Sequence, residues 1–407
     1  MTNRIQSIAM ARRMFEYRIY PKQKHISRLY TQFDLSCKAY NNLLEIQRTA
    51  YKTTGKGLSK YAMNRAITEM KKSDPTLKGA HSQVLQNCSD RLSKAFQSFF
   101  RRVKEKKAGK RVKVGYPRFK NRFHSITFPQ AGFGLDGDYL QVSKVGRIPI
   151  VYHRPTVGEV KTMTIKRAKS GKWFVVFSCD GGDNVAEHPT PEKAIGIDLN
   201  VENFAALSNG EIIENPRHLN QSEKRLKRLQ RRASKKQKGS NNRRKAKHLL
   251  AVQHEKVANQ RKDFLHKLSR QLVDEYGVIA MEDLTVAEMM KDHRFAKGIG
   301  DVSWSEFRGL VEYKAESAGT KLIIVDPYNT SQDCSTCGKI VPKKLSERMH
   351  RCKHCGAVLH RDVNAAINIL HRAGQARINA CGHTTSTLGI KPGASRVEES
   401  GTIRGGR

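Results

Sequence analysis

Two Cys-x-x-Cys pairs near the carboxyl-terminal end constrain the fold of this chain more than any other feature. The first pair is Cys334 and Cys337, the second is Cys352 and Cys355, and fourteen residues separate the two pairs. Such pairs supply the four thiolates of one tetrahedral zinc site. A glycine follows each pair (Gly338, Gly356) and allows the backbone to turn back under the sulfurs. The pattern predicts a structural zinc site, because four thiolates leave no open coordination position.

One alternative ligand stays open at this site, because His354 lies inside the second pair and could replace a cysteine. The remaining cysteines are scattered along the chain: Cys37, Cys88, Cys179 and Cys381. This usage indicates a reducing cytosol with one metal site and argues against a disulfide framework.

The net charge indicates the kind of partner. The chain of 407 residues has 76 Lys and Arg against 37 Asp and Glu, a formal net charge of +39. Residues 221–262 alone hold 16 basic side chains against two acids. A polyphosphate backbone is the usual partner of such an excess. A general basic protein is the plain alternative, and an anionic membrane surface lacks an obvious basic amphipathic anchor.

Periodicity divides the chain into a helical module, a β domain and an α/β domain. Helical spacing covers 21–107, whereas short alternating runs separated by Gly, Asp and Pro follow from 112 to 179 and indicate a small barrel or sandwich. An alternating run near Phe15 completes that β domain, so the helical module is an insertion in it. Residues 191–329 alternate apolar runs with helical stretches, and 287–301, which contain Gly298 and Gly300, are expected to form a mobile loop.

Three acids in the α/β domain are candidates for metal-dependent chemistry. Asp198 ends one apolar run, Glu282 ends another, and Asp362 starts a helical stretch. A lone carboxylate on an apolar element is costly, and Asp362 by itself could be only a helix cap. Three carboxylates that converge can hold two divalent cations for phosphodiester hydrolysis. Mg²⁺ suits such all-oxygen ligands.

The motifs around these residues resemble the TnpB family, the RNA-guided nucleases of insertion sequences. The resemblance covers roughly 14–372. It rests on Gly196-Ile-Asp-Leu, Met281-Glu-Asp-Leu, Val302-Ser-Trp-Ser-Glu-Phe, Glu312-Tyr-Lys-Ala, Thr330-Ser-Gln-Asp-Cys-Ser-Thr-Cys-Gly, Arg361-Asp-Val-Asn-Ala-Ala-Ile-Asn-Ile and the upstream Gly115-Tyr-Pro-Arg-Phe-Lys. In combination these motifs are highly specific.

The resemblance implies a multidomain α/β protein with a RuvC-like (RNase H fold) nuclease domain, and Asp198, Glu282 and Asp362 as its Mg²⁺-binding catalytic triad. It implies the following domains: a wedge β-barrel at 1–20 and 108–190, a helical recognition module at 21–107, the nuclease at 191–329 and 359–380, a zinc ribbon at 330–358, and a disordered tail at 381–407. It also implies a guide RNA, double-stranded target DNA beside a short recognised motif, a monomer, and a place in the prokaryotic cytoplasm near the nucleoid.

Two departures from the family pattern and five candidate nucleic-acid contacts complete the expectations. His360 stands where many members have Asp and is interpreted as a surface substitution, and Asn200 replaces a common Gly without expected harm. The resemblance implies motif reading at the junction of the recognition helices and the wedge, and RNA or DNA backbone contact in the stretch after the helices. The candidates are Lys60, Tyr61, Gln86, Arg118 and Lys120. Gln86 could equally be an ordinary polar helix residue, and Arg118 and Lys120 could equally be solvated side chains. An RNA-guided regulator without nuclease activity and an RNA-independent transposase are the alternative functions.

Overall fold

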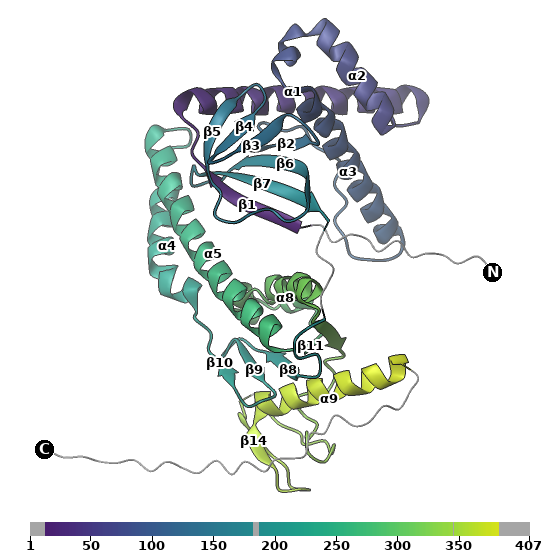
Figure 1. Ribbon diagram of the computed structural model, residues 1–407, viewed down its shortest axis with the longest axis vertical. Helices are drawn as coiled ribbons and strands as arrows, with labels where there is room; N and C mark the ends of the chain where they lie inside the picture. The colour runs from purple at the N-terminus through teal and green to yellow at the C-terminus, as the bar shows by residue number, and fades with distance from the viewer. Residues whose placement is uncertain (1–12, 182–186, 345, 382–407) are drawn as a thin grey trace, which may run out of the picture. The chain divides into compact units, whose positions relative to one another are not determined.

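The computed structural model describes residues 13–181, 187–344 and 346–381 (Figure 1). The chain divides into two compact units, Met1–Asn184 with Leu229–Val252, and Val185–Arg228 with Gln253–Arg407. No helix in the described residues is long and apolar enough to cross a membrane. The expected tail at 381–407 lies outside the described residues except for Cys381, the last residue of a helix.

The first unit is built on a seven-stranded antiparallel sheet in the order β2-β6-β7-β1-β5-β4-β3. Its strands are β1 (Arg13–Ile19), β2 (Ser125–Pro129), β3 (Phe133–Asp136), β4 (Tyr139–Val142), β5 (Gly146–Val151), β6 (Glu159–Arg167) and β7 (Trp173–Asp180). The amino-terminal strand β1 lies between β7 and β5, so the helices that follow it are an insertion between two strands of the same sheet, β1 and β2. Among the described residues no ladder joins β2 to β3, and a closed barrel stays a prediction.

The inserted helices pack on this sheet. They are α1 (Gln23–Thr54), α2 (Lys60–Ser73), the 3₁₀ turn η1 (Pro75–Gly79) and α3 (Ser82–Lys107). Gly55 ends α1 at a φ of 68°, a conformation that glycine adopts without steric cost. The Ser59 hydroxyl caps α2 by accepting the Ala62 N–H at 3.2 Å. Phe33 of α1 stacks on Trp173 of β7 with ring centroids 5.7 Å apart, which joins helices and sheet in one core.

The strand expected at Val112–Lys120 is wrong, because this stretch joins no ladder. The Asn41 amide on α1 instead donates to the Lys120 carbonyl and accepts the Lys120 N–H, both at 2.9 Å. A side chain therefore satisfies backbone groups that a neighbouring strand would otherwise take.

The second unit has a five-stranded mixed sheet in the order β10-β9-β8-β11-β12. Its strands are β8 (Ala194–Leu199), β9 (Ala205–Leu207), β10 (Ile212–Ile213), β11 (Val278–Glu282) and β12 (Lys321–Val325). The strands β8, β11 and β12 run parallel, and β9 and β10 continue the sheet antiparallel to β8. The main core includes side chains of α5 (Asn241–Glu275) and α8 (Trp304–Ala318), whereas α9 (Arg361–Cys381) forms a separate small cluster with β11 and β12.

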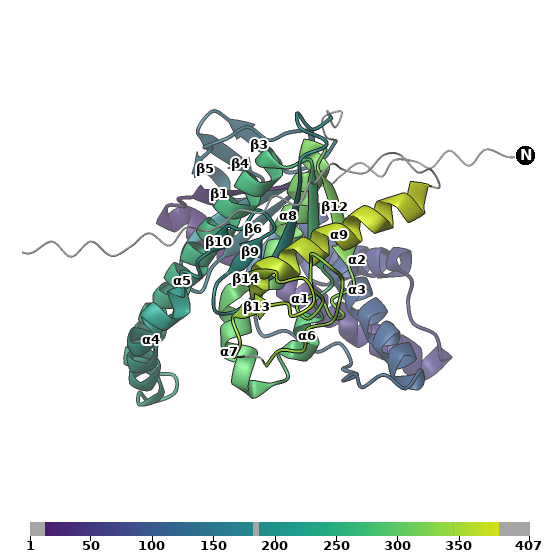
Figure 2. The ribbon, with the colours of Figure 1, turned by 90° about the horizontal axis from the view of Figure 1, so that it is seen from below.

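The basic stretch and four short elements complete the described chain, and Leu229–Val252 of the basic stretch belongs to the first unit. The basic stretch forms the helix α4 (His218–Ser234) and the amino-terminal half of α5, and β13 (Met349–Arg351) pairs with β14 (Val358–His360) between β12 and α9 (Figure 2). The loop expected at 287–301 is wrong, because α6 (Val286–Met289) and α7 (His293–Val302) occupy it. A Cβ on Gly298 would lie 2.5 Å from Val201 Cγ1. The glycine that suggested a loop instead allows close helix packing.

Lys314 on α8 is a buried cation whose titration is expected to change stability. Its ammonium group donates to the His266 carbonyl at 2.6 Å and to Ser269 Oγ at 2.8 Å on α5. Burial, and then Arg270, lower the pKa of Lys314 to about 8. Between that value and the unfolded pKa of about 10.4 the unfolded chain binds the proton more tightly, so stability rises with pH by up to about 3 kcal/mol.

We expect the thermal unfolding midpoint of the wild type to rise, relative to that of the Lys314→Met variant, as the pH increases through this window. The matched control is Lys267→Met on α5, because the Lys267 side chain is 76% exposed and pairs with exposed Asp263. Parallel pH profiles for wild type and Lys314→Met would contradict the assignment.

Candidate active site and metal centre

The three candidate acids come from two adjacent strands and one helix. The parallel register pairs Ile197 of β8 with Met281 of β11, so the next residues, Asp198 and Glu282, stand at neighbouring strand ends. A Cβ on Gly196 would lie 2.1 Å from the Ala366 carbonyl oxygen of α9. The glycine therefore allows α9 to lie directly on β8. This approach brings Asp362, the second residue of α9, to the ends of the strands.

The electrostatics show that these acids form one cluster. Burial, then the charges of Glu282 and Asp362, raise the pKa of Asp198 well above its ordinary value, and Arg361 and Asn200 oppose the shift. Burial also raises the pKa of Glu282, and a hydrogen bond from Thr330 opposes it. Carboxylates held close in a desolvated site are costly when ionised. This donor set fits divalent cations, which offset that cost.

Two polar side chains orient the acids. Asn200 Nδ2 donates to Asp362 Oδ2 at 3.1 Å, while Asn200 Oδ1 accepts the Asn203 N–H at 2.8 Å. Thr330, which is buried, donates its hydroxyl to Glu282 Oε1. Neither role was expected from the sequence, where Asn200 counted only as a harmless replacement of glycine. The sequence offered one signal for Thr330, its position four residues before Cys334. That position did not show that its hydroxyl would donate to Glu282.

His360 has a local role that its interpretation as a surface substitution missed. Its Nδ1 accepts the Asp362 N–H at 3.3 Å and lies 4.0 Å from Asp362 Oδ2. The side chain is 27% exposed. His360 therefore satisfies a backbone N–H at the start of α9 that the helix itself leaves without a partner.

The four cysteines converge as the spacing predicted. Their sulfurs all lie within 4.8 Å of one another, with Cys334 Sγ to Cys355 Sγ and Cys337 Sγ to Cys352 Sγ both 3.6 Å. A tetrahedron with Zn–S bonds near 2.3 Å has an S–S edge of about 3.8 Å. Among the described residues, these four cysteines are the set of His, Cys, Asp or Glu side chains whose ligand atoms are close enough to share one ion. The carboxylates of Asp198, Glu282 and Asp362 do not form such a set.

The two cysteine turns have the same construction. Gly338 N–H donates to the Cys334 carbonyl at 2.8 Å, and Gly356 N–H donates to the Cys352 carbonyl at 2.9 Å. Both glycines have φ near 70°, at 72° and 74°, where a side chain is strained. His354 is exposed, and the sulfurs of all four cysteines form the cluster without it.

One face of α9 holds the cysteine module. Asn364, Asn368 and Arg372 follow at spacings of four residues and therefore share a face. Asn364 accepts the Ser335 N–H at 3.0 Å and donates to the Asp333 carbonyl at 2.7 Å, and Asn368 donates to the Thr330 and Asp333 carbonyls at 2.8 Å. Arg372 pairs with Asp333 at 2.8 Å. The helix that carries Asp362 thus fixes the segment that carries Thr330.

The five candidate nucleic-acid contacts fall into two groups. Lys60 begins α2 and pairs with Asp90 of α3 at 2.6 Å, Tyr61 is 81% exposed, and Gln86 lies one turn before Asp90 on α3. Arg118 and Lys120 are exposed on the stretch that Asn41 holds. The first three therefore surround one face of the α2–α3 pair, and the other two lie on a separate segment.

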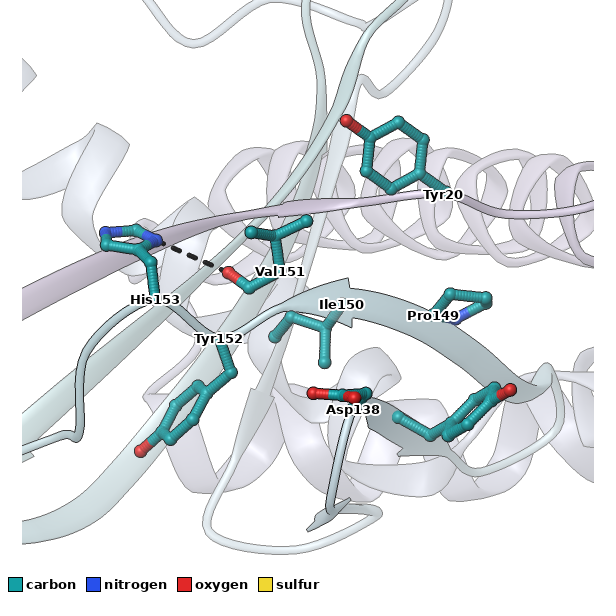
Figure 3. A pocket seen from close by; sticks show the side chains of 8 residues that line it. Tyr20, Asp138, Pro149, Ile150, Val151, Tyr152 and His153 are labelled. Atoms are coloured by element: carbon teal, nitrogen blue, oxygen red, sulfur yellow. Dashed lines mark hydrogen bonds between the residues drawn. The ribbon is translucent and has the colours of Figure 1, made fainter.

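A hollow of about 470 Å³ on the sheet of the first unit is separate from all of these residues (Figure 3). Its lining comprises Tyr20, Asp138, Tyr139, Pro149, Ile150, Val151, Tyr152 and His153. None of the candidate catalytic, zinc or nucleic-acid residues is among them.

Comparisons with known proteins identify the family. A model described as a probable transposase matches residues 176–293, a Cas12f1-like TNB domain matches 304–369, and a helix-turn-helix domain matches 10–56. A putative RNA-guided DNA endonuclease of Streptomyces pristinaespiralis is 36% identical over 391 residues, covering 94% of this chain and 92% of the relative. The chain belongs to the TnpB family.

A second relative and a solved structure are consistent with the assignment of this chain to the TnpB family. The putative RNA-guided DNA endonuclease InsQ of Escherichia coli K12 is 31% identical over 374 residues, with 86% of this chain and 89% of the relative covered. Among solved structures, a Cas12f1–sgRNA–target DNA complex aligns with a TM-score of 0.52 at 18% identity, covering 85% of this chain and 82% of that one. At this identity the likeness concerns the fold alone. The resemblance inferred from the motifs is confirmed.

Proposed function

We propose that the protein is an RNA-guided DNA endonuclease that cuts double-stranded target DNA beside a short motif. The observation that carries this proposal is the convergence of three acids, with Asp362 buried and Asp198 and Glu282 partly buried, at the ends of β8 and β11 and the start of α9. Relatives of nearly full length are named as RNA-guided DNA endonucleases. The net charge of +39 supplies the attraction to RNA and DNA backbones.

The second unit is proposed as a RuvC-like nuclease domain in which Asp198, Glu282 and Asp362 hold two Mg²⁺ ions. When bound between carboxylates, such ions activate water and stabilise the leaving oxygen of a phosphodiester. Asn200 and Thr330 orient two of the carboxylates through the hydrogen bonds described above. The burial that raises the pKa of Asp198 and of Glu282 makes their ionised forms costly, and a bound cation would offset that cost.

The other parts receive matching assignments. The cysteine module is proposed to bind one structural Zn²⁺, supported by sulfur separations close to those of a tetrahedral site. The sheet of the first unit is proposed as the wedge and α1–α3 as the recognition module, with Lys60, Tyr61 and Gln86 reading the motif. Arg118 and Lys120 are proposed to contact nucleic-acid backbone. A monomer that works in the cytoplasm near the nucleoid fits this activity.

The decisive experiment combines identification of the RNA with cleavage. The protein is co-expressed with its own locus, the bound nucleic acid is sequenced, and the complex is incubated with a randomised-flank target plasmid and Mg²⁺. One discrete RNA and cuts beside one enriched flank are expected. Binding without cutting would instead identify an RNA-guided regulator, and specific cutting without RNA would identify an RNA-independent transposase.

Thr330→Val is expected to slow target cleavage about tenfold while target binding stays unchanged. The valine keeps the shape of the side chain but removes the hydrogen bond that orients Glu282. Loss of this bond is expected to raise the activation free energy by roughly 1–1.5 kcal/mol. The single-turnover cleavage rate in saturating Mg²⁺ measures the effect. Thr320→Val is the matched control, because buried Thr320 donates to backbone carbonyls of Val273 and Tyr276. Equal cleavage rates for the two variants would contradict the role of Thr330.

A further inference from the structure

A cluster of aromatic rings lies where α3 ends and the chain turns back along α1. We call it the aromatic surface, and it comprises Phe96, Phe99, Phe100, Tyr116 and Phe119 with Arg48 of α1. Tyr116 meets Phe96 and Phe99 edge-on, both with ring centroids 5.4 Å apart. The Arg48 guanidinium lies 4.7 Å from the Phe119 centroid and 5.4 Å from that of Tyr116.

The rings are only partly used for packing. Phe96 is buried, but Phe100 is 54% exposed, Phe119 46% and Tyr116 39%. Exposed large rings scattered singly need no explanation, whereas a contiguous group on one surface indicates a binding site. The group is also held in place, because Asn41 makes two hydrogen bonds to the Lys120 backbone directly after Phe119.

The charge around the rings identifies the partner. Residues 101–122, which connect and flank the rings, contain eleven Lys and Arg against the single acid Glu105. Glu105 is itself paired with Arg101 at 3.7 Å. An apolar protein partner would not require this excess. Rings set in a one-signed basic surface match the combination of π-faces and phosphates in a nucleic-acid strand.

We infer that the aromatic surface binds a single-stranded segment of nucleic acid by stacking bases on Tyr116 and Phe119, with phosphates neutralised by the surrounding Lys and Arg. Arg48 supports the rings through cation–π contacts on one side. Bases in a duplex are already stacked, so an intact duplex cannot use these rings. The inference deepens the proposed function, on which it rests for the identity of the strand.

The test measures binding of single-stranded oligo-dT and oligo-rU to the full-length protein, freed of bound nucleic acid, over a series of salt concentrations. The double variant Tyr116→Leu with Phe119→Leu is expected to bind about 5- to 100-fold more weakly at every salt concentration. The slope against salt is expected to stay unchanged, because no phosphate contact is lost. Arg118→Gln is expected to reduce that slope by about one with both rings intact.

Two further measurements make the result decisive. Tyr328→Leu removes a tyrosine that is 74% exposed outside the aromatic surface, and it is expected to change nothing. Phe119→Trp is expected to keep affinity and to show fluorescence quenching when an oligonucleotide binds. Unchanged affinity in the double variant, equal weakening of duplex binding, or binding to Phe119→Trp without quenching would overturn the inference. A larger loss of affinity for oligo-rU would indicate that the surface binds RNA. A larger loss of affinity for oligo-dT would indicate that it binds displaced DNA.

This assay needs neither guide nor Mg²⁺. Failure of RNA-guided cleavage would therefore leave the stacking result intact, and failure of stacking would leave the proposed cleavage chemistry intact. Thermal unfolding of each variant checks that the α1–α3 core, in which Phe96 is buried, is retained.

Discussion

Asp198→Asn abolishes target cleavage, by about a thousandfold or more, and leaves the metal-free protein at least as stable as the wild type. The first expectation follows because the carboxylate would hold the catalytic cations, and a thousandfold loss corresponds to about 4 kcal/mol of transition-state stabilisation. The second follows from the raised pKa of Asp198. An ionised group whose pKa is raised by folding costs free energy at neutral pH, and the amide removes that charge.

The matched control for this variant is Asp283→Asn. Asp283 directly follows Glu282, but its side chain is 62% exposed and pairs with Arg308 at 2.7 Å on the surface. Its loss is expected to leave the cleavage rate within about twofold, because an exposed ion pair contributes little. Cleavage rate, target affinity and thermal midpoint are measured for both variants. Undiminished cleavage by Asp198→Asn would remove Asp198 from the triad.

Loss of one zinc-site cysteine is the second change with a large expected effect. Cys352→Ser is expected to remove the bound zinc and to unfold the cysteine module, since structural zinc binding contributes roughly 10–16 kcal/mol in isolated finger peptides. Although desolvation opposes ionisation, hydrogen bonds from the Cys355 and His354 N–H groups lower the pKa of Cys352 to about 6. Its thiolate is therefore available at neutral pH, whereas the raised pKa of Cys337 and of Cys355 means that zinc displaces protons from those two thiols.

The zinc variants are compared by metal content, thermal unfolding and cleavage. His354→Asn is the matched control, because exposed His354 lies between the same cysteines, and it is expected to keep one zinc per chain. Cleavage is expected to fall with Cys352→Ser, since the segment that carries Thr330 is held between the module and α9. Loss of zinc in His354→Asn with retention in Cys352→Ser would reverse the ligand assignment.

Most elements followed from local patterns, and the exceptions have identifiable causes. Helical periodicity over 21–107 predicted the module that contains α1, α2 and α3. The stretch 112–120 alternates like a strand, yet it joins no sheet. The backbone N–H and carbonyl of Lys120 form hydrogen bonds with the Asn41 side chain on α1 instead. Two glycines suggested a loop at 287–301, but α7 lies there. The missing side chain of Gly298 allows this helix to pack against Val201.

By itself the sequence determined which side chains are available for chemistry. Residue type and spacing sufficed for the four cysteines, because both Cys-x-x-Cys turns are local structures completed by their own glycines. The three acids were nominated in the same way, since each ends an apolar run or begins a helix, and their catalytic role stays a prediction. The basic composition likewise indicated nucleic acid without any knowledge of the fold.

Only the tertiary structure decided which distant groups meet. The bond from Asn200 to Asp362 spans 162 residues, and the bond from Thr330 to Glu282 spans 48. Both depend on how closely α9 approaches β8, which the missing side chain of Gly196 permits. The aromatic surface likewise requires α1, α3 and the stretch after them to pack together. Periodicity reports only the face of an element that is buried, whereas such contacts depend on how separate elements pack against one another.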